Sequence, residues 1–270
     1  MAKSLAELRE MHKKMMSEDQ SSGGNQKTSE WATFEDGDNI IRFLPGKEDP
    51  LEFFTEGSVH KFQDNEGNWR NYKCRKSSGE KCPVCDFYFD LWNRHKELNL
   101  GKDADGKNVK SKFGDLAVKL KAKPRYYSIA VVRNLQEQGE NPVRYVAMSK
   151  QLFDRVMQAM ISDDFQDSSD PDNTTIISLE QGNDFNIRLT KNGNWNSFTE
   201  SSAKYKKTRA GTPAEVAEWM ENELNIHSLV EVDTYEKGKE IVMNLEATLN
   251  PIKTESTPPW SEDEGGELQV

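Results

Sequence analysis

Three cysteines and a histidine place the strongest constraint on how this chain can fold. Two of the cysteines form the motif Cys82-Pro83-Val84-Cys85, whose tight turn lets both thiolates face one ion. Cys74 lies shortly upstream, so one site would use every cysteine of the chain. Three thiolates and one imidazole form a tetrahedral ligand set that suits Zn²⁺. The sequence therefore predicts one structural zinc ion, bound by Cys74, Cys82, Cys85 and a histidine.

Two histidines are candidates for the fourth ligand, and the spacing leaves both open. His60 lies in an expected strand, whereas His95 follows Cys85 in an expected helix. With either histidine, four protein ligands close the metal shell, while a catalytic zinc keeps one position open. The chain also lacks the zinc-deaminase pattern and any H-E-x-x-H. A zinc-dependent hydrolase or deaminase is therefore a weak alternative, and we expect no enzyme.

The charged residues are segregated along the chain, although the net charge is −10. Basic residues dominate from Lys102 to Arg125, and a second basic cluster runs from Lys204 to Arg209. Acidic residues collect between 163 and 172, between 215 and 246, and near the C-terminus. This pattern allows a basic surface on an acidic body, and it is equally compatible with a mosaic of solvated faces.

The chain shows no sign of a membrane segment or an export signal. It has no apolar run of about 18 residues and no hydrophobic core near its first residue. We therefore expect a cytoplasmic protein without a membrane partner, in a reducing compartment where clustered thiols hold a metal rather than form disulfides.

Composition divides the chain into three parts. Residues 1–16 have the periodicity of an amphipathic helix, and residues 17–29 contain no apolar side chain. A short helix on such a linker needs a partner surface to fold on, which predicts that residues 1–29 are a self-association arm. Residues 30–250 are the expected core. Residues 251–270 are rich in proline, serine and acids, and we expect a disordered tail.

The pattern of the core predicts an α+β fold that is mainly β. Alternating and β-branched runs predict strands at 39–44, 58–63, 68–73, 125–133, 145–147, 174–179 and 184–190. Helical periodicity and capping signals predict helices at 150–161, from 213 through 220, and at 234–249. Short strands of this kind are typical of a barrel such as the OB-fold. The predicted helices put the helical part of the core toward its C-terminal end.

Basic and aromatic side chains occur together twice, which favours binding of single-stranded nucleic acid. Basic side chains follow a phosphate backbone, and flat rings stack on unpaired bases. Tyr126 and Tyr127 point to opposite faces of an expected strand, so one of them can belong to the core. The predicted phosphate contacts are Arg42, Lys121, Lys123, Arg125, Lys204, Lys206 and Lys207, and the predicted stacking residues are Tyr126, Tyr127, Trp195 and Phe198.

With these residues in place, the chain resembles the single-stranded DNA-binding, or helix-destabilising, proteins of T4-like bacteriophages. The resemblance covers about residues 30 to 245. The stretches that carry it are residues 40–45, His60 with Cys74, the motif Cys82–Cys85, residues 121–127 with 129–132, and the helix at 152–161.

The resemblance implies an OB-fold core with an inserted zinc subdomain at about residues 55–100 beside it, DNA in a basic cleft between them, and His60 as the fourth ligand. It also implies cooperative coating of DNA through the N-terminal arm. Phage replication and recombination proteins would bind the acidic tail, in the cytoplasm of the infected bacterial host. We therefore expect sequence-independent protection of single-stranded DNA in replication, recombination and repair. An RNA-binding regulator on the same fold is the alternative.

Overall fold

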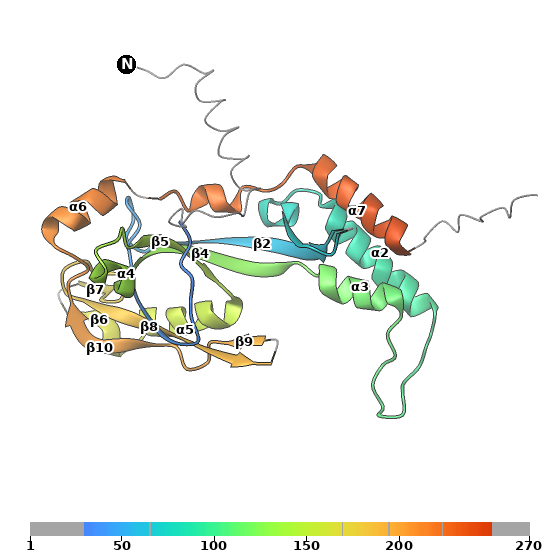
Figure 1. Ribbon diagram of the computed structural model, residues 1–270, viewed down its shortest axis with the longest axis horizontal. Coiled ribbons are helices and arrows are strands. Elements are labelled where there is room, and N and C mark those ends of the chain that lie inside the picture. The colour runs from blue at the N-terminus through green and yellow to red at the C-terminus, as the bar shows by residue number, and fades with distance from the viewer. Residues whose placement is uncertain (1–29, 65, 169, 194, 223, 250–270) are drawn as a thin grey trace, which may run out of the picture.

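The computed structural model describes residues 30–249 except 65, 169, 194 and 223 (Figure 1). It confirms the predicted α+β class, with one large antiparallel sheet and six α-helices among the described residues. The predictions for residues 1–29 and 251–270 lie outside the described part. The strands are β1 (Gly37–Phe43), β2 (Phe54–Gln63), β3 (Trp69–Lys73), β4 (Lys123–Val132), β5 (Val143–Met148), β6 (Gln166–Asp167), β7 (Asp170–Thr174), β8 (Gly182–Asn192), β9 (Trp195–Ser197) and β10 (Ser202–Thr208). The helices are α2 (Pro83–Glu97), α3 (Lys112–Leu120), α4 (Arg133–Glu137), α5 (Lys150–Met160), α6 (Pro213–Glu221) and α7 (Tyr235–Leu249), with short 3₁₀ turns at Arg75–Ser78, Asp163–Phe165 and His227–Val230.

The central strand of the sheet is β4, a segment rich in aromatic and β-branched residues. The strand order is β10-β8-β1-β4-β2-β3, with β5 paired to β4 and β9 paired to β8. The first half of β4 pairs with β2, and its last residues, 130–132, pair with β1. The pairing with β5 holds the middle of the strand. Because β4 pairs with both β1 and β2, it joins the strands β10, β8 and β1 to the strands β2 and β3.

The main hydrophobic core lies between the sheet and α5. Side chains of β1 and β8 such as Phe43 and Phe185 are fully buried there, and Leu152 and Val156 of α5 pack against them. Ser149 caps α5 by accepting the N–H of Leu152. The apolar stripe predicted for this helix is therefore confirmed as its buried face.

A second core belongs to the subdomain inserted between β2 and β4. It consists of β3, α2 and α3, and Figure 1 shows α7 returning from the C-terminal side to cover α2. Pro83 occupies the first turn of α2, where its missing N–H costs no hydrogen bond. Tyr72, Leu91, Leu120 and Ile241 are buried together in this core. These elements therefore pack around a hydrophobic core of their own, which reaches beyond residues 55–100 to α3 and α7.

Two local predictions need correction. The strand predicted at 174–179 is wrong, because the chain turns after Thr174. Thr175 donates its N–H to the Phe165 carbonyl and accepts from the N–H of Asn183, so Ile176 and Ile177 reach the core from a turn. Helix α3 was not expected from the sequence. Its capping by Ser111 and its packing against α2 stabilise it despite Gly114.

Candidate metal centre and nucleic-acid interface

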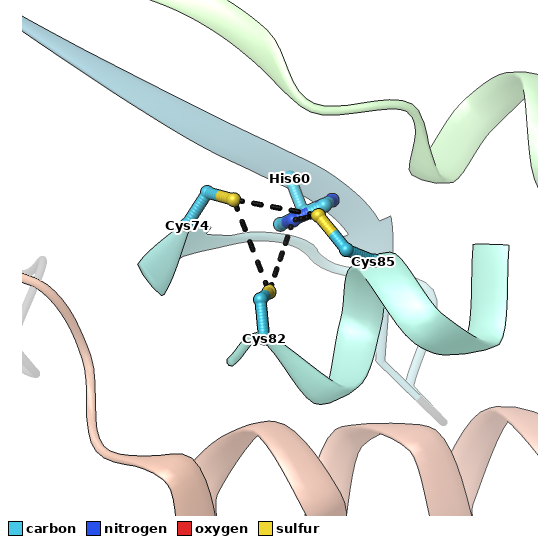
Figure 2. Close-up of side chains that lie close together, drawn as sticks. All are labelled: His60, Cys74, Cys82 and Cys85. Atoms are coloured by element: carbon cyan, nitrogen blue, oxygen red, sulfur yellow. Dashed lines mark hydrogen bonds between the residues drawn. The ribbon is translucent and has the colours of Figure 1, made fainter. Parts of the chain in front are cut away.

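The metal centre is assembled from three separate elements. His60 lies on β2, Cys74 follows the end of β3, Cys82 is the N-cap of α2, and Cys85 lies in the first turn of that helix (Figure 2). All four side chains are buried, and their ligand atoms lie within 4.8 Å of one another. The hairpin turn between β2 and β3 brings His60 to Cys74, and the 3₁₀ turn returns the chain to Cys82.

The distances between the four ligand atoms match a tetrahedral zinc site. The Cys74 Sγ lies 3.8 Å from the Cys82 Sγ and 3.5 Å from the Cys85 Sγ. The His60 Nε2 lies 3.5 Å from each of the Cys82 and Cys85 sulfurs. Zn–S bonds of about 2.3 Å and a Zn–N bond of about 2.0–2.1 Å at tetrahedral angles give about 3.8 Å between sulfurs and about 3.6 Å between sulfur and nitrogen. The cluster can therefore hold one metal ion.

The orientation of the His60 ring is fixed from outside the cluster. Its Nδ1 lies 2.6 Å from the carbonyl oxygen of Leu120, the last residue of α3. With Nδ1–H donating to this carbonyl, the lone pair of Nε2 is free to face the thiolates. His95 is not part of the cluster: its Nδ1 instead contacts the Ser111 hydroxyl at 3.0 Å. The ambiguity between the two histidines is thus resolved by tertiary structure.

The electrostatics of the cluster favour a bound cation. Hydrogen bonds with the thiols of Cys74 and then Cys85 lower the pKa of Cys82, and hydrogen bonds with Cys74 and then Cys82 raise the pKa of Cys85, so the cluster favours a thiolate at Cys82. Burial by itself lowers the pKa of His60, but contacts with Cys74, Cys82 and the Leu120 carbonyl raise it to about 9. The sulfurs that favour a proton on the Nε2 of His60 would equally favour a metal ion bound there.

The basic row begins directly after Leu120, which contacts the metal ligand His60, and it continues along β4. Lys121 directly follows Leu120, and both Lys121 and Lys123 are exposed, while Arg125 is half-buried. Sequence reasoning missed Lys61 on the adjacent strand β2. Burial and then the positive charges of Arg125 and Lys123 lower the pKa of Lys61. The sequence did hold a signal for Lys61, because Lys61 directly follows the candidate ligand His60 in the strand predicted at 58–63.

The two tyrosines of β4 have different environments. Tyr126 is buried, and its ring stacks on Phe153 of α5 with centroids 3.7 Å apart and an interplanar angle of 3°. Tyr127 is half-buried on the opposite face, in edge contact with Trp31 at 6.0 Å. Tyr126 therefore belongs to the core, and a stacking role for it is not supported. Trp31, which is 39% exposed and contacts Tyr127, is an aromatic residue that the sequence analysis did not predict at this surface.

The structure is against the prediction that Arg42 contacts phosphate. Its side chain is fully buried, with the guanidinium 2.8 Å from a carboxylate oxygen of Asp184. It also donates to the carbonyls of Gly182, Ser178 and Thr208 and to the Thr208 hydroxyl. Burial lowers the pKa of Arg42, while the Asp184 carboxylate raises it. Arg42 is a structural residue that joins β1 to β8 and β10, because the fold leaves none of its surface to solvent.

The second basic–aromatic group lies on β9 and β10. Trp195 is 75% exposed, Phe198 is partly packed against the main core, and Lys204, Lys206 and Lys207 are all exposed. A register shift between Ala203 and Lys207 bulges β10 outward, and the Asn183 amide donates to the carbonyls of Lys204 and Tyr205. In the sheet order, β8 and β1 separate this group from β4. The two groups that looked alike in the sequence therefore occupy different parts of the sheet.

An α+β protein with a closed four-ligand metal site and exposed basic and aromatic residues on its strands has the features of the class that binds single-stranded nucleic acid. The family model described as gp32 DNA binding protein like matches residues 35–249, so the chain belongs to that family. Membership supports single-stranded DNA binding and the identification of this chain as a gp32-type protein. The family is DNA-binding and non-enzymatic.

No curated protein sequence matches the chain. Within the described ranges, none of the helices combines the length and apolarity needed to cross a bilayer.

Proposed function

We propose that the protein binds single-stranded DNA without sequence preference, through backbone phosphates and base faces. The observation that carries the proposal is the row at the start of β4, in which exposed Lys121, just ahead of the strand, and exposed Lys123 precede the partly exposed ring of Tyr127. This combination provides charge for the backbone and a flat surface for a base, and stacking on a ring does not depend on which base is present. The proposed contact set is Lys61, Lys121, Lys123, Arg125, Tyr127 and Trp31 around β4, and Trp195, Phe198, Lys204, Lys206 and Lys207 on β9 and β10.

The metal in this proposal is one structural Zn²⁺. His60, Cys74, Cys82 and Cys85 would hold it, and the ion would supply cross-linking between β2, the end of β3 and α2. Because Leu120 binds His60 and precedes Lys121, the centre also fixes the start of the basic row. In this proposal the zinc ion supports DNA binding by holding the basic row in place, and it takes part in no chemical step.

The wider role in the proposal is cooperative coating of single strands during replication, recombination and repair in a phage-infected bacterium. Residues 1–29 would bind neighbouring copies along the strand, and residues 251–270 would bind phage replication and recombination proteins. The support for these roles is the amphipathic and acidic character of the two segments and the family resemblance.

A titration of the full-length protein tests the proposed function. Tryptophan fluorescence is followed with oligo(dT), with a DNA duplex of equal length and with an RNA of matching sequence, at several salt concentrations. We expect strong and salt-sensitive binding of oligo(dT) and much weaker binding of duplex. Equal affinity for duplex contradicts single-strand binding, and tighter binding of RNA favours the RNA-binding regulator instead.

Tyr127→Ala is expected to weaken binding of oligo(dT) by about 1–3 kcal/mol, the usual effect of removing one stacked aromatic. The residue is partly exposed on the sheet face opposite Tyr126, so the main core should remain folded. Trp69→Ala is the matched control, because Trp69 is a 61% exposed aromatic on β3 outside the proposed contacts. Equal affinity of the two variants at equal melting temperature would remove Tyr127 from the interface.

Deletion of residues 254–270 is expected to tighten DNA binding at low salt and to have little effect at high salt. The deleted segment carries a cluster of acids around Asp263 that competes with DNA for basic side chains. The measurement compares the oligo(dT) affinity of the truncated and full-length proteins across a salt series. Identical affinities at low salt would show that the tail does not occupy the DNA site.

A further inference from the structure

The segment that joins α2 to α3 forms a finger, residues 98–111, which projects from the metal-binding subdomain (Figure 1). Lys102 and Asn108 pair as an antiparallel bridge, and the Val109 N–H donates to the Gly101 carbonyl at 3.2 Å. The Asp103 carboxylate closes the tip, because its Oδ1 accepts the N–H groups of Asp105 and Lys107 at 3.0 and 2.8 Å. The finger therefore has a defined shape of its own.

The base of the finger is anchored to both flanking helices. Ser111 contacts the His95 ring on α2 through its hydroxyl, which also accepts the Gly114 N–H and so caps α3. Gly114 lies so close to His95 that a Cβ there would be 3.1 Å from the ring. The Lys112 ammonium donates to the Leu249 carbonyl at 2.6 Å. These contacts set the direction of the finger relative to α3 and β4.

The chemistry of the finger suits contact with phosphates rather than with bases. It carries three exposed lysines, Lys102, Lys107 and Lys110, and contains no aromatic residue. Its two acids are Asp103, whose carboxylate is bound within the turn, and the exposed Asp105. Ammonium groups without flat rings offer charge to a backbone but no stacking surface.

The finger projects on the side of β4 from which the β8–β9 hairpin also extends, whereas α7 lies on the other side (Figure 1). The hairpin carries Trp195, and α3 leads from the finger directly into Lys121 and Lys123. We propose that the finger is a phosphate-binding arm that flanks the path of the bound single strand, with Lys102, Lys107 and Lys110 contacting its backbone. The inference rests on the proposed function.

The test compares two double variants of the full-length, zinc-loaded protein. Lys102→Gln with Lys107→Gln neutralises both sides of the finger. Lys47→Gln with Lys239→Gln removes the same charge from exposed positions on the β1–β2 loop and on α7. For each protein, the affinity for oligo(dT) is measured against salt concentration.

We expect the finger variant to bind more weakly and its salt slope to fall by about 0.7 for each lost phosphate contact, or about 1.4 in all. The fluorescence change at saturation should equal that of the unsubstituted protein, because no stacking residue is altered. The control variant should keep the original slope. A finger variant whose slope equals that of the control overturns the inference, whether or not its affinity differs. Failure of the unsubstituted protein to prefer single strands would instead overturn the proposed function.

Discussion

Loss of the metal is expected to destabilise the inserted subdomain more than any other single change. Cys85→Ser, or treatment with a strong chelator, would remove the cross-link that the proposed zinc ion makes between β2, the end of β3 and α2. Structural zinc contributes about 10–16 kcal/mol of apparent binding free energy in small peptides. If only about 5 kcal/mol is lost here, the melting temperature falls by about 10–20 °C for a domain of this size. Zinc content and thermal unfolding are the measurements.

The same change is expected to weaken DNA binding at temperatures where the main core stays folded. Leu120 accepts the hydrogen bond of His60 and precedes Lys121, so loss of the centre releases the start of the basic row. His95→Gln is the matched control, since His95 lies outside the cluster, and it should retain zinc. If the Cys85→Ser protein keeps its zinc and has the same melting temperature as the unsubstituted protein, the centre has no structural role.

Asp184→Asn is expected to destabilise the main core by about 3–5 kcal/mol, the usual cost of leaving a buried charge unpaired. Asp184 Oδ1 lies 2.8 Å from the Arg42 guanidinium and 2.7 Å from that of Arg133. Arg42 is completely buried, so the substitution leaves its charge without a carboxylate. Urea unfolding of the two proteins measures the difference.

Asp38→Asn is the matched control for this prediction. Asp38 pairs with Arg188 on the surface, where both side chains are about half exposed, and such pairs contribute about 0–1 kcal/mol. If Asp184→Asn costs no more than the control, the Arg42–Asp184–Arg133 network does not stabilise the fold. Per folded molecule, DNA binding by Asp184→Asn should be unchanged, because the network lies outside the proposed contacts.

Local sequence patterns predicted most of the elements that frame the site. The hairpin of β2 and β3, the central strand β4 and the amphipathic helix α5 all follow from periodicity and turn residues within single segments. The capping box of Thr212 and Glu215 at α6 is formed as expected. The strand predicted at 174–179 failed because the backbone of Thr175 bonds to Phe165 and Asn183, which holds the buried Ile176 and Ile177 in a turn.

By itself, the sequence determined the chemistry of this protein: the thiolate set for one metal ion, and basic residues next to aromatic ones. These features are properties of residue type and spacing, and they need no knowledge of contacts. Tertiary structure decided which members of each set can bind the metal or reach the protein surface. It placed His60 rather than His95 at the thiolates, buried Arg42 against Asp184, and put Tyr126 in the core while Tyr127 faces Trp31. Burial and partner choice depend on segments far apart in the chain, so no local pattern could supply them.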